Sequence, residues 1–346
     1  MKKVFSLFLL MINIGYLQAQ IGGKATYQFL SMPYTARTSA LSGSNLAIWD
    51  NDLNNLYINP ALLDSSQDQH LSLNYQNYLS DINYGLVSFA KYFKKYGMFA
   101  ASINYLHYGT FTEADATGMR LGTFSASDYS LNIYHARPIN SKWQIGAAFK
   151  ILYSSYYHYN SMGIALDGGI SYHNDAKNLS FAFVFQNLGH QLKPYREGNY
   201  EPLPFNTQIA FAKKLEHAPF RFLLNLHHLH NWGMRYESPI NLSNVFLTEA
   251  DSSNEISTFD KIGDEFIRHI NVGVEIVPTQ NIFLRISYNF QRYKEMLVDD
   301  RYGMLGFSFG LGIKINKFRI SYAHTIYHVA GASNTFSISS NLHEFY

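Results

Sequence analysis

The chain of 346 residues contains no cysteine. It therefore has neither a disulfide nor a cysteine that could carry a lipid anchor, so any attachment to a membrane must come from the fold. Charged residues make up only 15% of the chain, well below the roughly 25% typical of soluble domains. The net charge of +2 gives no argument for a nucleic-acid partner.

Long hydrophobic runs are absent after the first 20 residues. A membrane-spanning helix needs about 20 mostly apolar residues, and the mean hydropathy of −0.15 is too low for a protein built from such helices. Aromatic residues are abundant at 16%. Few charges, many aromatics and a neutral hydropathy fit strands that alternate lipid-facing and lumen-facing side chains. Because only helices and closed barrels satisfy every backbone polar group in a membrane, the composition favours a β-barrel.

The first 19 residues have the pattern of a secretory signal peptide. A basic start at positions 2 and 3 precedes a mostly apolar stretch, Val4 to Tyr16, that is short for a membrane span. Ala19 supplies a small residue at the cut, so cleavage would leave Gln20 as the N-terminus. The alternative is a buried N-terminal helix.

Residues 20–66 are rich in small residues and turns, and they end in Asn59, Pro60, Ala61 and Leu62. Small residues allow close backbone packing, and Pro60 argues against a ladder strand at this point. We expect this segment to form a hatch inside a barrel made by residues 67–346.

Fourteen strand-length segments follow the hatch, an even number as bacterial barrels require. If the barrel starts in the periplasm, every connection longer than five residues falls at the outer end. A soluble all-β protein would have no reason to keep that parity. The segments are 69–79, 83–93, 96–108, 125–138, 142–156, 163–174, 177–187, 204–215, 219–230, 267–278, 281–293, 303–315, 317–330 and 333–345.

Alternation of side chains supports these strands. In 281–293, Ile282, Leu284, Ile286, Tyr288 and Phe290 share one face, which we expect to meet lipid. Arg285, Ser287, Asn289 and Gln291 share the other face, toward the lumen. In 142–153 the apolar face begins and ends with the aromatics Trp143 and Tyr153, as the two aromatic girdles of a barrel would require.

For every candidate catalytic, cofactor or metal motif, an ordinary structural role explains the residues better. The three histidines His227, His228 and His230 lack a carboxylate in register, so we interpret them as polar residues near the outer rim. The pair Asp299-Asp300 fits solvated loop charge better than a cation site. There is neither a glycine-rich phosphate loop nor a nucleophile motif, so we expect no enzyme activity.

The longest outer connection, 231–266, mixes many apolar residues with acidic ones. Long loops without regular structure are usually functional or disordered, and so much apolar surface suggests a partner-binding region or a self-packed lid over the barrel mouth. Connections 109–124 and 188–203 are alternatives for partner binding. The candidate partner residues are Val245, Phe246, Leu247, Ile256, Phe259 and Phe266.

The hatch resembles that of the long-chain fatty-acid transporter type of outer-membrane barrel, which has fourteen strands and an Asn-Pro-Ala motif. Asn59-Pro60-Ala61 matches that motif immediately before the first strand. More narrowly, the opening resembles the PorQ family of the type IX secretion system in Gly22-Gly23, Tyr27 to Leu30, Pro33, Ala36-Arg37, Ala40-Leu41, Gly43 and Asn59 to Leu62. Ser42 stands where this resemblance leads us to expect glycine, and the related PorV barrels share the hatch style.

The resemblance implies an integral protein of a Gram-negative outer membrane with loops exposed at the cell surface. It also implies a non-enzymatic role, in which the barrel anchors a PorZ-like surface protein in a cargo attachment complex with a PorU-like sortase and a PorV-like barrel. The alternative is a transporter of hydrophobic compounds, which needs an apolar pocket in the lumen and a path past the hatch. The polar lumen face at Arg285 and Ser287 favours the anchor.

Overall fold

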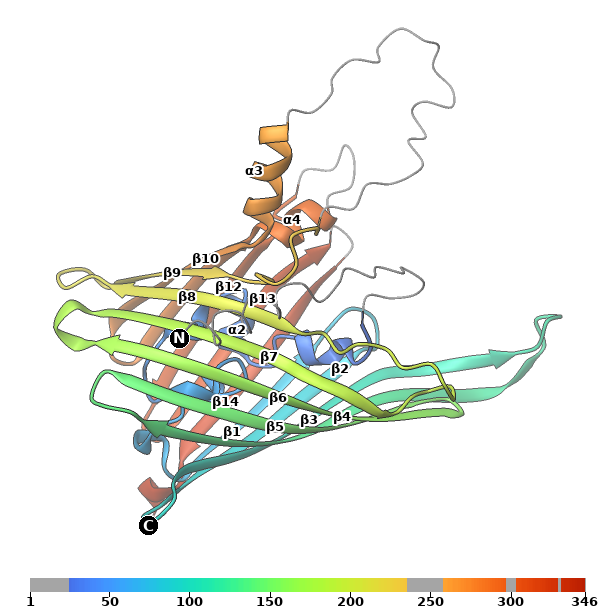
Figure 1. Ribbon diagram of the computed structural model, residues 1–346, viewed down its shortest axis with the longest axis horizontal. Helices are drawn as coiled ribbons and strands as arrows, with labels where there is room; N and C mark the ends of the chain where they lie inside the picture. The colour runs from blue at the N-terminus through green and yellow to red at the C-terminus, as the bar shows by residue number, and fades with distance from the viewer. Residues whose placement is uncertain (1–24, 235–257, 297–302, 329–330, 346) are drawn as a thin grey trace, which may run out of the picture.

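The computed structural model describes residues 25–234, 258–296, 303–328 and 331–345. Within them, fourteen antiparallel strands close into a barrel in which each strand pairs with its chain neighbours and β1 pairs with β14 (Figure 1). This confirms the predicted fourteen-stranded fold. The strands are β1 (His70–Asn77), β2 (Asn83–Phe93), β3 (Gly97–Ala114), β4 (Arg120–Pro138), β5 (Trp143–Tyr156), β6 (Tyr159–Asn174), β7 (Leu179–Lys193), β8 (Asn206–Lys214), β9 (Phe220–Leu226), β10 (Ile270–Thr279), β11 (Ile282–Asn289), β12 (Phe307–Ile315), β13 (Phe318–His328) and β14 (Gly331–Asn341).

Long and short connections are divided between the two ends of the barrel as predicted. Those longer than five residues, 194–205, 227–269 and 290–306, all lie at the same end of the barrel. Short turns belong to the periplasmic side of such barrels, so we name the end with the long connections the outer end and the other the inner end. The proposed signal peptide, residues 1–19, lies outside the described residues.

Several predicted boundaries are wrong. Strand β7 continues to Lys193, so the first six residues of the predicted connection 188–203 belong to a strand. Most of 109–124 is strand rather than loop, because its threonine and phenylalanine residues pair across β3 and β4 from Thr110–Ser125 to Ala114–Arg120. The segment 281–293 leaves the ladder at Asn289, whose side chain accepts a hydrogen bond from Arg292 N and caps helix α4 (Phe290–Met296). Strand β9 stops at Leu226, before His228 with its left-handed φ of 54°.

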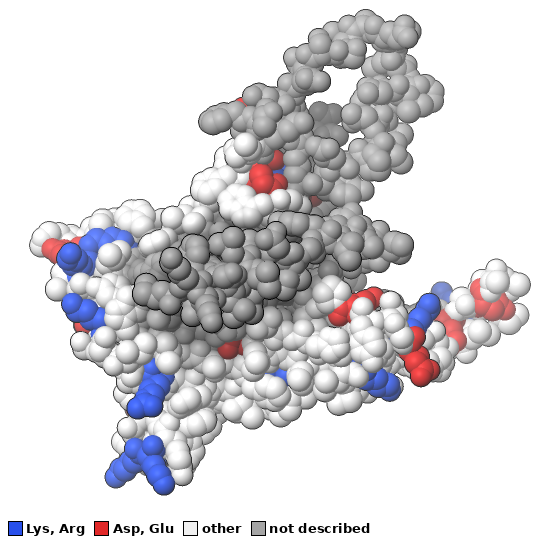
Figure 2. Space-filling model, in the orientation of Figure 1, with Lys and Arg blue, Asp and Glu red and all other residues white. Residues whose placement is uncertain are grey.

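The side chains of β11 alternate between the outside and the lumen, as predicted, up to Asn289. Leu284 and Ile286 are exposed on the outside, whereas Arg285 and Ser287 are buried in the lumen. The outside of β5 likewise exposes Ile145, Phe149, Ile151 and Tyr153. The face drawn in Figure 2 shows a nearly uncharged band along the barrel, with charged residues gathered toward its two ends. Such a band fits the hydrocarbon layer of a membrane.

Residues 25–67 form a chain of short helices that fills the lumen. These are η1 (Gln28–Ser31), α2 (Ala36–Ala40), η2 (Ser44–Ala47), η3 (Leu53–Asn55), η4 (Pro60–Leu62) and η5 (Ser65–Gln67). Side chains of Thr35, Asp52, Asn59 and Asp64 accept backbone N–H bonds at the starts of α2, η3, η4 and η5, so these four turns satisfy one of their own donors. The small residues Ala36 and Ala40 are fully buried and pack with Ala323 of β13.

The hatch, residues 25–67, passes through the lumen from the outer to the inner end. Thr26 N donates to Pro202 O in the outer connection between β7 and β8, 2.9 Å away. Gln144, close to the inner end of β5, contacts Leu63 O, and β1 then begins at His70. The other helices in the described residues are α3 (Thr258–Arg268) at the outer end, η6 (Asp175–Lys177) in an inner turn and η8 (Leu342–Phe345) after β14. No described helix is long and apolar enough to cross a membrane.

Candidate functional site

The Asn-Pro-Ala motif of the hatch lies directly against the barrel wall. An ideal Cβ on Gly146 of β5 would stand 2.3 Å from Pro60 O, and one on Gly169 of β6 would stand 2.4 Å from Asn59 Oδ1. No side chain fits in either gap. Two wall glycines, 23 positions apart in the sequence, therefore provide the space in which this turn lies.

Asn59 uses its whole side-chain amide in this contact. Its Nδ2 donates to Leu46 O within the hatch (2.8 Å) and to Ser171 Oγ of the wall (2.9 Å). Its Oδ1 accepts from Ala61 N (2.9 Å), which closes the turn around Pro60. Asn59 is fully buried, so each of these bonds replaces a water contact that the folded protein cannot make.

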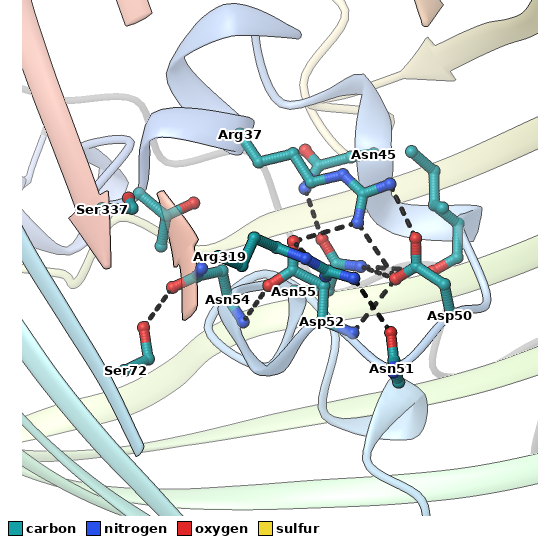
Figure 3. A network of polar contacts seen from close by, with 12 residues as sticks. Arg37, Asn45, Asp50, Asn51, Asp52, Asn54, Asn55, Ser72, Arg319 and Ser337 are labelled. Carbon is teal, nitrogen blue, oxygen red and sulfur yellow. Dashed lines mark hydrogen bonds and ion pairs between the residues drawn. The ribbon is translucent and has the colours of Figure 1, made fainter. Parts of the chain in front are cut away.

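A buried ionic network joins the hatch to the opposite side of the wall (Figure 3). The Arg37 guanidinium of α2 contacts Asp50 (2.8 Å), Asp52 (3.1 Å) and Glu275 of β10 (3.0 Å). Arg37, Asp52 and Glu275 are each 2% exposed or less, and Asp50 is 24% exposed. Three carboxylates around one guanidinium require further cations, because an uncompensated buried charge is costly.

Three wall arginines supply those cations. Arg285 Nε lies 2.9 Å from Glu275, Arg221 also pairs with Glu275, and Arg319 lies 3.4 Å from Asp52. Burial alone would raise the pKa of Asp50, but the Arg37 guanidinium holds it below its usual value. Arg319 and Arg37 likewise hold the pKa of Asp52 low against the effect of burial. Both hatch carboxyls therefore stay charged. Asp50 pairs with Arg221 of β9 and Asp52 with Arg319 of β13, while Arg37 joins the hatch to Glu275 of β10.

Ser42 and Gly43 form a tight left-handed turn between α2 and η2. Their φ angles are 48° and 78°, a region that glycine adopts at little cost and other residues rarely do. Ser42 stands where the resemblance predicts glycine. The cost of its left-handed backbone is offset by a hydrogen bond between its Oγ and Ser287 Oγ of β11 (2.8 Å). The departure from the expected glycine thus creates another bond between hatch and wall.

The outer mouth holds a vestibule of about 920 Å³ between the start of the hatch, the β7–β8 connection and the outer ends of β9 to β11. His228 and His230 line it together with Arg268 and Lys294. His227 points elsewhere: it is buried beside His269, and His227 N bonds to His269 O (2.9 Å). Within the described ranges, no group of three or more His, Asp or Glu residues is arranged to hold a metal ion.

His269 was not singled out from the sequence, although it lies next to the predicted histidine group. It follows α3 by one residue, and the strand pairing of β9 with β10 brings it to His227. Glu265 is one helical turn before it, 3.8 Å from His269 Nε2. A carboxylate therefore does lie near the group, although it comes from 35 positions further along the chain than His230.

The outer ends of β3 and β4 project beyond the rest of the barrel as a two-stranded ribbon, residues 110–125 (Figure 1). The last pair of β2 with β3 is Asn83–His107, and the first pair of β4 with β5 is Ala126–Tyr156. Between these positions and the ribbon tip, neither strand has a second neighbour among the described strands. Large apolar side chains on the ribbon are exposed, namely Phe111 (42%), Met119 (65%) and Leu121 (61%).

The residues proposed for partner binding in 231–266 are only partly described. Val245, Phe246, Leu247 and Ile256 lie outside the described residues. Phe259 is on α3, and Phe266 is on the same helix with 46% of its surface exposed, stacked at 6.5 Å on Trp232. Asp299 and Asp300 also lie outside the described residues.

The closed barrel, its short inner turns and its lumen-filling N-terminal segment define an outer-membrane barrel with an internal hatch. No protein-family model matches the chain, and no curated protein sequence matches it. Solved structures of outer-membrane channels are similar in fold, and their identities of 10–11% show the fold alone.

Three of these structures show how far the similarity extends. The monoaromatic hydrocarbon channel TodX, as a deltaS2S3 mutant, has a TM-score of 0.55 and 11% identity, covering 89% of this chain and 99% of that chain. The toluene transporter TbuX of Ralstonia pickettii has a TM-score of 0.53 and 10% identity, with 89% and 98% covered. TodX of Pseudomonas putida, also a toluene transporter, has a TM-score of 0.52 and 10% identity, with 89% and 96% covered. These neighbours are channels and transporters rather than enzymes.

Proposed function

We propose that this barrel is a non-enzymatic outer-membrane component of type IX secretion, and that it anchors a PorZ-like surface protein in the cargo attachment complex. The observation that carries the proposal is the fixed hatch. Arg37 and Asn59 belong to the residues that resemble the PorQ family, and both contact the wall, on opposite sides of the barrel. Two of the residues that carry the resemblance therefore hold the hatch against the barrel wall.

A hatch that is held to the wall by many contacts fits a protein that anchors a surface partner better than a protein that transports a compound through its lumen. The described hatch residues between Tyr34 and Leu63 are mostly buried, and ion pairs of the hatch with three different strands, β9, β10 and β13, resist displacement of the segment. The two outer cavities share no lining residue with the two clefts at the inner end. A compound that displaced this part of the hatch would have to break the buried ionic network, which costs several kcal/mol.

The ribbon, residues 110–125, is the surface that we propose for the partner. Exposed strand edges are templates for pairing with another chain, and proteins usually protect them with lysine or proline. Residues 110–114 and 121–125 contain neither residue. A strand of the surface protein can add to this edge through main-chain hydrogen bonds, while Phe111 and Leu121 supply apolar contacts.

The second candidate function is transport of hydrophobic compounds. The fold comparisons support it better than they support the anchor, because TodX and TbuX are described as hydrocarbon or toluene channels and transporters. The outer vestibule of about 920 Å³ would be the entry site. Its lining by Arg268, Lys294 and Glu295 is polar, whereas sites for apolar ligands are mostly apolar.

One pair of variants separates the two functions. Replacing residues 111–124 by an Asn-Gly turn removes the ribbon while keeping the barrel. We expect the surface partner to appear in the medium and cargo attachment to fall, with normal heat-modifiable migration of the barrel. A partner that stays on the cell surface would overturn the assignment of the ribbon.

The second variant locks the hatch. Ser42→Cys with Ser287→Cys replaces two hydroxyls that are 2.8 Å apart, and no other cysteine is present to compete. The anchor proposal expects oxidation to leave cargo attachment unchanged. The transport candidate expects oxidation to block uptake of toluene or a fatty acid, and reduction to restore it.

A further inference from the structure

A small cavity of about 220 Å³ lies below the vestibule, between the hatch and the inner surface of β7 to β11. It shares Ser31, His228 and Gln291 with the vestibule lining, so it opens toward the outer end of the barrel. Its floor is the hatch turn at Thr38, Ser42 and Gly43. The volume corresponds to about seven water molecules at roughly 30 Å³ each.

Three buried polar atoms that line this cavity have no hydrogen-bond partner within the described structure. They are Asn225 Oδ1, Asn271 Oδ1 and His227 Nε2, on side chains that are 1%, 5% and 4% exposed. The amide nitrogens of both asparagines are used, since Asn271 Nδ2 donates to Ser42 O and Asn225 Nδ2 donates to Gln208 Oε1. The orientation of the two amides is thus fixed with their oxygens as acceptors, and the Asn271 side chain also interacts with His227.

The imidazole of His227 is neutral at physiological pH. Burial, together with the neighbouring rings of His228 and His269, lowers the pKa of His227 to about 3, although hydrogen bonding with the Asn271 side chain acts in the opposite direction. Its Nε2 therefore offers a neutral hydrogen-bonding atom rather than a charge. Arg292 is the one lysine, arginine, aspartate or glutamate in the described lining of the cavity.

The lining is dominated by amides, with an apolar strip on the hatch side. Leu30, Met32, Leu46 and Ile58 form that strip, next to the ring of Tyr57. Amides combine a donor and an acceptor in a fixed plane, and a few placed polar groups against an apolar surface give orientation to a small ligand. The lining amides are Gln186, Asn187, Asn206, Gln208, Asn225, Asn271, Asn289 and Gln291.

We propose that this cavity binds one ring of a neutral saccharide that enters from the cell surface. A sugar ring has hydroxyls that both donate and accept, and it has C–H faces that pack on apolar side chains. Its hydroxyls would donate to the two unpartnered amide oxygens. An anionic ligand is disfavoured because acceptor oxygens, rather than cations, are the unpartnered groups. This proposal stands independently of the secretion role.

The test uses the full-length protein in a zwitterionic detergent, since detergents with sugar headgroups would compete. Saturation-transfer NMR with methyl α-glucoside, methyl α-galactoside, methyl α-mannoside and N-acetylglucosamine measures binding, with glucuronate as the anionic comparison. We expect at least one neutral sugar to bind and to be weakened about tenfold or more by Asn225→Ala with Asn271→Ala, because two hydrogen bonds are lost.

Asn104→Ala is the matched control. Asn104 is also a fully buried lumen asparagine with an unpartnered amide atom, but it does not line the cavity, so binding should be unchanged. If the double variant fails to fold, Ser31→Trp narrows the shared mouth at an exposed position and should weaken binding as well. Absence of any sugar signal, with water as the only occupant, overturns the proposal, as does equal binding by wild type and the cavity variants.

Discussion

The carbonyl oxygen of Pro60 occupies the space where a Cβ on Gly146 would stand, 2.3 Å away. We therefore expect Gly146→Ala to push the hatch turn off the wall and to reduce the free energy of unfolding by about 1–3 kcal/mol, the usual cost of overpacking. Guanidinium unfolding of the detergent-solubilised barrel measures this. Gly122→Ala is the control, because the nearest atom to its Cβ would be at 3.8 Å. Equal stability of the two variants would show that the turn moves without cost.

Replacement of Asn59 should loosen the hatch through lost hydrogen bonds rather than through sterics. Asn59→Ala removes bonds to Leu46 O, Ser171 Oγ and Ala61 N, so we expect a loss of about 1–3 kcal/mol for the buried groups left unpaired. Asn59→Asp keeps the acceptor for Ala61 N but buries a charge. It should be at least as destabilising as Asn59→Ala in the same unfolding assay. A stable aspartate variant would contradict the burial of this site.

Arg37→Met should destabilise the protein more than either of those changes. The substitution leaves Asp50, Asp52 and Glu275 without their shared guanidinium, and breaking a buried ionic contact typically costs about 3–5 kcal/mol. Arg137→Met, at an exposed position near the inner end, controls for the loss of one positive charge. Hydrogen exchange of residues 36–55 should rise in the first variant and stay low in the second.

Acid should weaken the ion pairs by which Asp50 and Asp52 hold the hatch to the wall. The pKa values of Asp50 and Asp52 are held below their usual range, so their stabilising contribution is complete above the ordinary aspartate pKa of about 3.9 and is lost as the pH falls through the lowered values. We expect the unfolding midpoint to be flat from pH 7 to about 5 and to drop below about pH 4. Asp50→Asn should make that drop shallower. A midpoint that falls between pH 7 and 5 would point to other groups.

The orientation of the barrel can be tested with single cysteines, because the chain has none of its own. Thr117→Cys lies in the exposed turn of the ribbon, and Lys95→Cys lies in an exposed inner turn. A membrane-impermeant maleimide should label the first in intact cells and the second only after the outer membrane is permeabilised. The reverse pattern would invert the barrel.

The strand count could be predicted because its signals are local. Alternation with period two sets the two faces of β11 wherever it pairs, and the lengths of the connections set the parity of the ends. Local signals failed where two structures compete for the same residues. The helix cap at Asn289 ends a segment whose alternation continues in the sequence to Gln291. The pairing of Thr110 with Ser125 extends the two strands past Gly109 and Gly122, which by themselves indicate turns.

The amino-acid sequence by itself determined that this chain forms a fourteen-stranded barrel with one apolar and one polar face, since a strand's periodicity needs no knowledge of its neighbours. Only the tertiary structure decided which polar residues meet. Arg37 and Glu275 are 238 positions apart, and Asn225 and Asn271 face the same cavity only because β9 and β10 pair around the hatch. The physical reason is that such contacts depend on barrel closure and on the path of the hatch, which place residues together regardless of their separation along the chain.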